Sequence, residues 1–131
     1  MHNIIIYIGE HQFEAELYDT PTGKAVLNAL PFETSALIWG DEIYFDVPAN
    51  AQLERDAKAE VEVGDLAYWP SMPAFCIFFG PTPVSLGNEP RAASAVNVFG
   101  KLKTVDLTIL RSIDYGEEVR VEKMERGALV R

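Results

Sequence analysis

Residues 66–100 read LAYWPSMPAFCIFFGPTPVSLGNEPRAASAVNVFG, and this segment contains only two charged residues, Glu89 and Arg91. It also contains six aromatic residues and five of the eight prolines of the chain. Apolar and aromatic side chains are costly to expose to water, so they are usually buried or line a concave surface. We therefore expect this segment either to fill the core or to form an apolar groove.

Short apolar runs within the segment predict strands over residues 66–69, 74–79 and 95–99. A proline-containing turn over residues 70–73 and a long loop over residues 80–93 separate them. We expect Phe75, Phe78, Phe79 and Phe99 to pack in the core, because their rings carry no polar atom. Cys76 lies among these phenylalanines and is expected to be a buried thiol.

The flanking sequence continues the pattern of short strands. Alternation and β-branched runs predict strands over residues 3–8, 12–18, 35–39, 42–47, 61–63 and 118–124. Two short helices are predicted over residues 21–30 and 106–113, the first capped by Asp19 or Thr20 and beginning with Pro21. Eight or nine short strands with two helices favour an antiparallel sheet closed into a barrel. We predict a mainly β fold with residues 1–131 forming a single domain.

Composition narrows the classes of partner and the compartment. The formal net charge of -9 argues against nucleic acid and anionic membranes as partners. The single cysteine excludes an internal disulfide and fits a reducing compartment. The apolar run over residues 4–8 is too short for a signal peptide or a membrane span. We therefore predict a cytoplasmic protein.

Few residues of the chain suggest metal or cofactor chemistry. The only histidines, His2 and His11, cannot with one cysteine supply the ligands of a typical metal site, so no metal is expected. The GPTP turn at residues 80–83 lacks the free amides of a phosphate-binding loop, and no cofactor is predicted. Glu42 and Asp46 share a strand face with Tyr44. We interpret this face as solvated, with acid–base catalysis as the alternative.

Aromatic residues with a polar edge are the candidates for a groove. Trp39, Tyr44, Tyr68 and Trp69 can each present a ring to a ligand while the polar edge stays in water. Arg91 is the only basic residue between positions 58 and 101. It can hold a carbonyl or carboxylate group of a ligand, or it can pair with its neighbour Glu89.

Several motifs resemble known proteins. PTGKAVLNAL at residues 21–30 and VFGKL at residues 98–102, the latter followed by a short helix, resemble segments of cyclophilins, which are peptidyl-prolyl isomerases. A closer resemblance, over essentially the whole chain, is to small single-domain cyclophilin-like proteins of bacteria and archaea. It is carried by WGDEIYF at 39–45, GDLAYWP at 64–70, FFGPTP at 78–83 and ASAVNVFG at 93–100. The resemblance implies a closed eight-stranded barrel with two short capping helices, and a groove where cyclophilins bind proline.

The chain departs from cyclophilins at the positions associated with isomerisation. No arginine precedes Arg55, and the Phe-x-x-Gln signature is missing. By alignment on residues 98–101, the pocket tryptophan of cyclophilins corresponds to Arg91 and the pocket histidine to Val96. The resemblance therefore implies a binding barrel with weak or no prolyl isomerase activity.

The resulting hypothesis is a groove that binds a peptide or a small ring-containing ligand, neutral or anionic. Two alternatives remain open. The protein can be a genuine peptidyl-prolyl cis-trans isomerase, or a structural or regulatory subunit of a homo-oligomer or of an amide-processing complex. The candidate ligand-binding residues are Trp39, Tyr44, Tyr68, Trp69, Phe78, Thr82 and Arg91.

Overall fold

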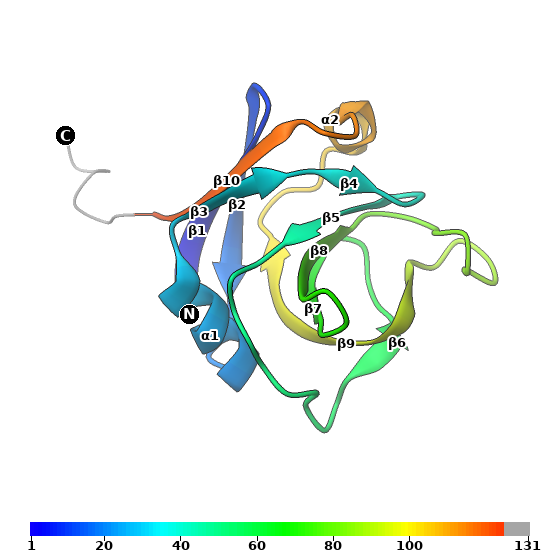
Figure 1. The fold of residues 1–131 in the computed structure, drawn as a ribbon. Coiled ribbons are helices and arrows are strands. Elements are labelled where there is room, and N and C mark those ends of the chain that lie inside the picture. Colours follow the sequence, from blue (N-terminus) through cyan, green and yellow to red (C-terminus); the bar gives the residue numbers. More distant parts are fainter. Residues whose placement is uncertain (125–131) are drawn as a thin grey trace.

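The structure is a computed structural model that describes residues 1–124. Within these residues the fold is mainly β, with ten strands and two short helices (Figure 1). The elements in chain order are β1 (His2–Ile8), β2 (His11–Leu17), α1 (Pro21–Ala29), β3 (Phe32–Ser35), β4 (Leu37–Ile38), β5 (Glu42–Asp46), β6 (Lys58–Glu60), β7 (Asp65–Trp69), β8 (Ala74–Phe78), β9 (Arg91–Leu102), α2 (Leu107–Ser112) and β10 (Glu118–Lys123). Neither helix is long and apolar enough to cross a membrane.

All strand pairs are antiparallel, and the hydrogen-bonded order is β3-β10-β1-β2-β9-β7-β8-β5-β4, with β6 on β9. The two end strands, β3 and β4, are separated in the chain by Ala36 alone. One bent segment thus pairs with β10 through its first part and with β5 through its second. The covalent chain, rather than a ladder, joins the two edges, so the predicted closure into an eight-stranded barrel is not confirmed.

The main core lies on the inner face of this curved sheet. The predicted alternation over residues 12–18 is confirmed, because Phe13, Ala15 and Leu17 are buried while their neighbours point outward. At the centre, the rings of Phe45 and Phe75 stack with centroids 4.8 Å apart, and Phe99 meets Phe75 edge-on at 5.0 Å. Burial of each such ring contributes roughly 1.5–3 kcal/mol. The predicted core role of Phe75 and Phe99 is confirmed.

Buried polar contacts hold the irregular segment between β5 and β6 in place. The side-chain amide of Asn97 in β9 donates to the Thr22 hydroxyl at 2.9 Å and to the Gln52 carbonyl at 2.8 Å. Its oxygen accepts the Glu54 amide at 2.8 Å. Because Thr22 lies in α1, this one side chain joins the helix, the irregular segment and β9.

Candidate functional site

A cavity of about 190 Å³ lies on the outer face of β5, β7 and β8. Its lining residues are Trp39, Glu42, Tyr44, Trp69, Cys76, Ala92, Ala93 and Val96. We call this cavity the outer-face pocket. A larger hollow of about 490 Å³ lies over β1, β3 and β10, but polar and charged side chains such as Glu33, Glu118 and Arg120 contribute to its walls. Ligand sites are mostly apolar with a few polar groups, which favours the outer-face pocket.

Strand alternation places the pocket side chains. In β5, Ile43 and Phe45 enter the main core, so Glu42 and Tyr44 must point to the other face of the sheet. Tyr44 pairs directly with Cys76 of β8, which brings these two side chains together on the outer face. The pocket floor is therefore fixed by the β5–β8 register.

Strand β9 supplies the cover of this face. Its C-terminal half pairs with β7, and the register slips where Leu66 and Ala67 face Gly100 and Val98. The extra residue, Phe99, is a β-bulge that bends the strand. Its N-terminal half turns to β6 instead (Figure 1). This bend brings Ala92 and Val96 against the apolar cluster on the outer face of the sheet, and with Ala93 they line the pocket.

Glu42 is the charged side chain of the pocket, and it is buried, with only 6% of its surface exposed. Burial raises the pKa of its carboxyl from 4.5 to about 7, and the neighbouring Cys76 thiol partly opposes that rise. The interpretation of this face as solvated is wrong for Glu42, which is buried. It holds for Asp46 on the same strand, which is exposed.

Cys76 lies beside Glu42 and is fully buried, as expected from the sequence. Burial and the nearby carboxyl raise the pKa of its thiol well above the ordinary value. The thiolate, which is the nucleophilic form of cysteine, is therefore disfavoured. Cys76 forms part of the pocket wall and is not an activated nucleophile.

The sequence-based candidates divide between the pocket and other places. Trp39, Tyr44 and Trp69 line the cavity. The indole N–H of Trp69 also donates to the Ser94 hydroxyl at 2.7 Å, which fixes the orientation of its ring. Phe78 is fully buried in the apolar cluster on the outer face of the sheet and is not among the lining residues.

Tyr68 lies on the opposite face from Trp69 and is 2% exposed in the main core. Its hydroxyl donates to the Ala49 carbonyl at 3.0 Å and accepts the Ala51 amide at 3.1 Å. Both bonds tie down the segment after β5. The structure therefore gives Tyr68 a packing role away from the pocket.

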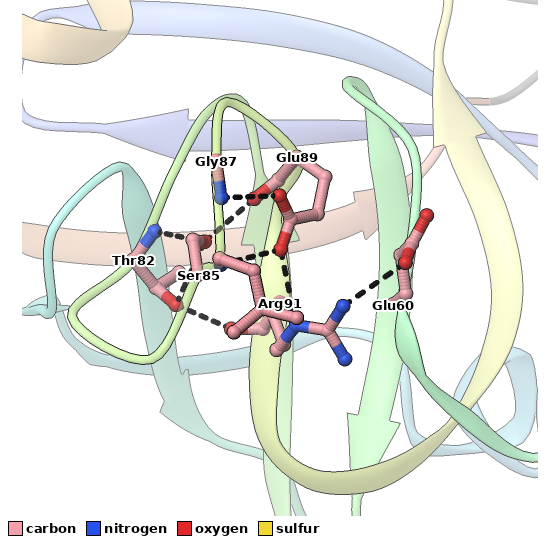
Figure 2. Close-up of polar contacts among 7 residues, drawn as sticks. Glu60, Thr82, Ser85, Gly87, Glu89 and Arg91 are labelled. Atoms are coloured by element: carbon pink, nitrogen blue, oxygen red, sulfur yellow. Dashed lines mark hydrogen bonds and ion pairs between the residues drawn. The ribbon is translucent and has the colours of Figure 1, made fainter.

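Thr82 and Arg91 belong to a hydrogen-bonded loop beside the pocket (Figure 2). The Arg91 guanidinium lies 3.0 Å from a Glu60 oxygen and 3.1 Å from a Glu89 oxygen. The Thr82 hydroxyl donates to the Arg91 carbonyl. The structure thus shows the pairing alternative for Arg91, and neither residue lines the pocket.

The Glu89 carboxylate organises the tip of this loop. It accepts the Leu86 amide at 2.7 Å and the Gly87 amide at 2.8 Å in addition to its pair with Arg91 (Figure 2). These hydrogen bonds, that from Leu86 first, lower the pKa of Glu89 to about 2. Polar contacts hold the loop in place, and its charged side chains already have partners.

Two kinds of pocket residue were missed in the sequence. Glu42 was expected on the same strand face as Tyr44, but that face was interpreted as solvated, so Glu42 was not among the ligand-binding candidates. Ala92 and Ala93 line the pocket because β9 begins at Arg91, within a segment predicted to be a loop, whereas Val96 lies in the strand predicted over residues 95–99. Small side chains gave no local signal for that. Among residues 1–124, no group of three or more histidine, cysteine or acidic side chains is placed to hold a metal ion.

Comparison with known proteins agrees with the fold. The family model described as cyclophilin-like matches residues 2–122. The solution structure of a hypothetical protein from Archaeoglobus fulgidus is similar, with 40% sequence identity and a TM-score of 0.77 over 94% of this chain and 95% of that chain. No curated protein matches the sequence. With nearly all of its length covered by the family model, the chain belongs to the cyclophilin-like family.

Proposed function

We propose that this protein is a binding barrel whose outer-face pocket holds a small ring-containing ligand or a single side chain of a peptide. The observation that carries the proposal is a cavity of about 190 Å³ walled by Trp39, Tyr44 and Trp69, with Glu42 as its buried polar group. A cavity of about 150 Å³ is large enough for benzene. The size therefore suits one ring or one compact head group, not an extended drug-sized molecule.

Weak or absent prolyl isomerase activity is part of this proposal. Rotation about a peptide bond has a barrier of about 18–20 kcal/mol, and its catalysis needs a donor near the amide nitrogen. Within residues 1–124 no lysine or arginine lines the pocket. Arg91, which follows the last turn of the neighbouring loop, is paired with Glu60 and Glu89.

Intrinsic fluorescence tests the location of the site. The chain has two tryptophans, and both line the pocket, so their emission reports on its occupancy. A panel of cyclic amides, proline dipeptides and small amines is titrated into wild type, Trp39→Ala and the control Leu86→Ala, whose side chain is 87% exposed. We expect Trp39→Ala to weaken the best binder by tenfold or more, with Leu86→Ala unchanged. Equal affinities in all three proteins contradict the proposal.

A genuine isomerase is the second candidate, and Glu42 is the observation in its favour. Because the pKa of this carboxyl is about 7, Glu42 is protonated in mildly acidic solution and can then donate a hydrogen bond into the pocket. NMR exchange spectroscopy of alanyl-proline peptides at pH 6 tests it. A rate above buffer that disappears in Glu42→Gln supports the isomerase. If peptides with several different residues before proline all isomerise only at the background rate, this candidate function is excluded.

A further inference from the structure

We infer that the outer-face pocket selects a small organic cation, such as a methylated ammonium group, with Glu42 as its counter-ion and Trp39, Tyr44 and Trp69 as its aromatic walls. The inference rests on the proposed binding function and names the chemistry of the ligand. It also departs from the expectation, made from the sequence, of a neutral or anionic ligand.

The charges around the pocket favour a cation. Glu42 is the one formally charged side chain among the lining residues, and none of the ion pairs within residues 1–124 includes it. The nearby basic side chains have other partners, since Arg91 pairs with Glu60 and Arg111 lies 3.2 Å from Asp41. The net charge of -9 adds a long-range field that attracts cations and repels anions.

The aromatic walls favour the same class of ligand. The face of an indole or phenol ring carries partial negative charge, so it attracts a cation held against it. Three such side chains surround this cavity, which is walled elsewhere by Ala92, Ala93 and Val96. Methyl groups on an ammonium can contact these apolar walls while its charge faces Glu42.

The donor set argues against an inorganic cation. Calcium and magnesium need about six oxygen ligands, and the pocket offers one carboxylate among apolar walls. Above pH 7 a neutral ligand is also a poorer match, because it leaves the ionised, buried carboxylate without a compensating charge. An organic cation supplies that charge and needs no further oxygen ligands.

Protonation of Glu42 links this selectivity to pH. The titratable groups that face it are Tyr44 on its own strand and Cys76 on β8. Burial raises the pKa of both, so both stay neutral near pH 7. The lining residues from β9 have no ionisable side chain. Because burial places the Glu42 pKa at about 7, its ionised form is available above that pH.

The test compares choline with 3,3-dimethylbutan-1-ol, which has the same shape but carbon in place of the charged nitrogen. Tryptophan fluorescence is recorded at pH 8.5 for wild type, Glu42→Gln and the control Glu33→Gln, which removes a carboxylate from the other hollow. We expect choline to bind wild type and Glu33→Gln at least tenfold more tightly than the alcohol. Glu42→Gln is expected to lose this preference.

A second arm uses wild type alone, so it does not depend on the folding of a variant. Choline keeps its charge at all pH values used, and its affinity should fall by about tenfold between pH 8 and pH 6 as Glu42 takes up a proton. An affinity independent of pH overturns the inference, as does equal binding of the alcohol. Equal binding of choline and the alcohol overturns the preference for a cation but does not contradict the proposed binding function of the pocket. If neither choline, nor the alcohol, nor any of the cyclic amides, proline dipeptides and small amines binds, the proposed function fails as well.

Discussion

The free energy of unfolding of wild type should fall as the pH rises, because Glu42 loses a proton, and Glu42→Gln should not show this fall. The pKa of this carboxyl rises from 4.5 in its ordinary state to about 7 in the folded protein, because the side chain is buried. Between these values the folded protein keeps a proton that the unfolded chain has released. Glu42 therefore contributes most to stability at acidic pH, and that contribution is lost as the pH rises through about 7.

The size of the effect follows from the two pKa values. Each unit of difference is equivalent to about 1.4 kcal/mol, so the free energy of unfolding should fall by about 2.5 kcal/mol between pH 5 and pH 8 through this group alone. Glutamine has almost the same shape and does not titrate. The difference in unfolding free energy between Glu42→Gln and wild type should therefore shift by about 2.5 kcal/mol in favour of the variant over this interval.

Urea denaturation of both proteins at pH 5, 6, 7 and 8 measures this difference. The contributions of the titratable groups that both proteins share cancel when the two free energies are subtracted. Asp46→Asn is the matched control, since Asp46 lies on the same strand face but is exposed. A shift of similar size in Asp46→Asn would show that burial of the side chain is not its cause. If wild type and Glu42→Gln give parallel curves, the carboxyl titrates normally and the burial argument is refuted.

Three other measurements examine separate parts of the structure. Tyr68→Phe should lower the free energy of unfolding by about 1–3 kcal/mol, since the buried Ala49 carbonyl and the partly buried Ala51 amide lose a partner. A change below about 0.3 kcal/mol in urea denaturation contradicts this role. Cys76 should react with a thiol reagent at pH 8 only after denaturant is added, and rapid labelling of the native protein opposes its assigned burial. Glu89→Gln should speed hydrogen exchange at the amides of Leu86 and Gly87, whereas unchanged exchange excludes the carboxylate as their main anchor.

Much of the fold was predictable because local pattern and tertiary structure agree. The helix over residues 21–29 begins where expected, with the Thr20 hydroxyl accepting the Gly23 amide at 3.0 Å and Pro21 in the first turn. The strand predicted at 61–63 is wrong, because the chain pairs with β9 through Lys58–Glu60 instead. Two valines favoured the later residues, but the partner strand fixed the register.

The candidate site was predictable only in part. Trp39, Tyr44 and Trp69 were found from their polar-edged rings, and all three line the pocket. Tyr68 could not have joined Trp69 in one pocket, because adjacent residues of a strand point to opposite faces. Burial of Glu42 was not visible locally, since it depends on the bend of β9, a contact between distant parts of the chain.

Chemical-shift mapping tests most directly whether the outer-face pocket is the binding site. Choline is titrated into the ¹⁵N-labelled protein at pH 8.5, where the two tryptophan indole N–H groups give separate reporters. We expect both indole signals, from Trp39 and Trp69, to move together with the amides of Ala92 and Ala93. Shifts confined to the hollow around Tyr7 and the strands beside it would contradict this assignment, and no shifts at millimolar choline would contradict the cation as the ligand of the pocket.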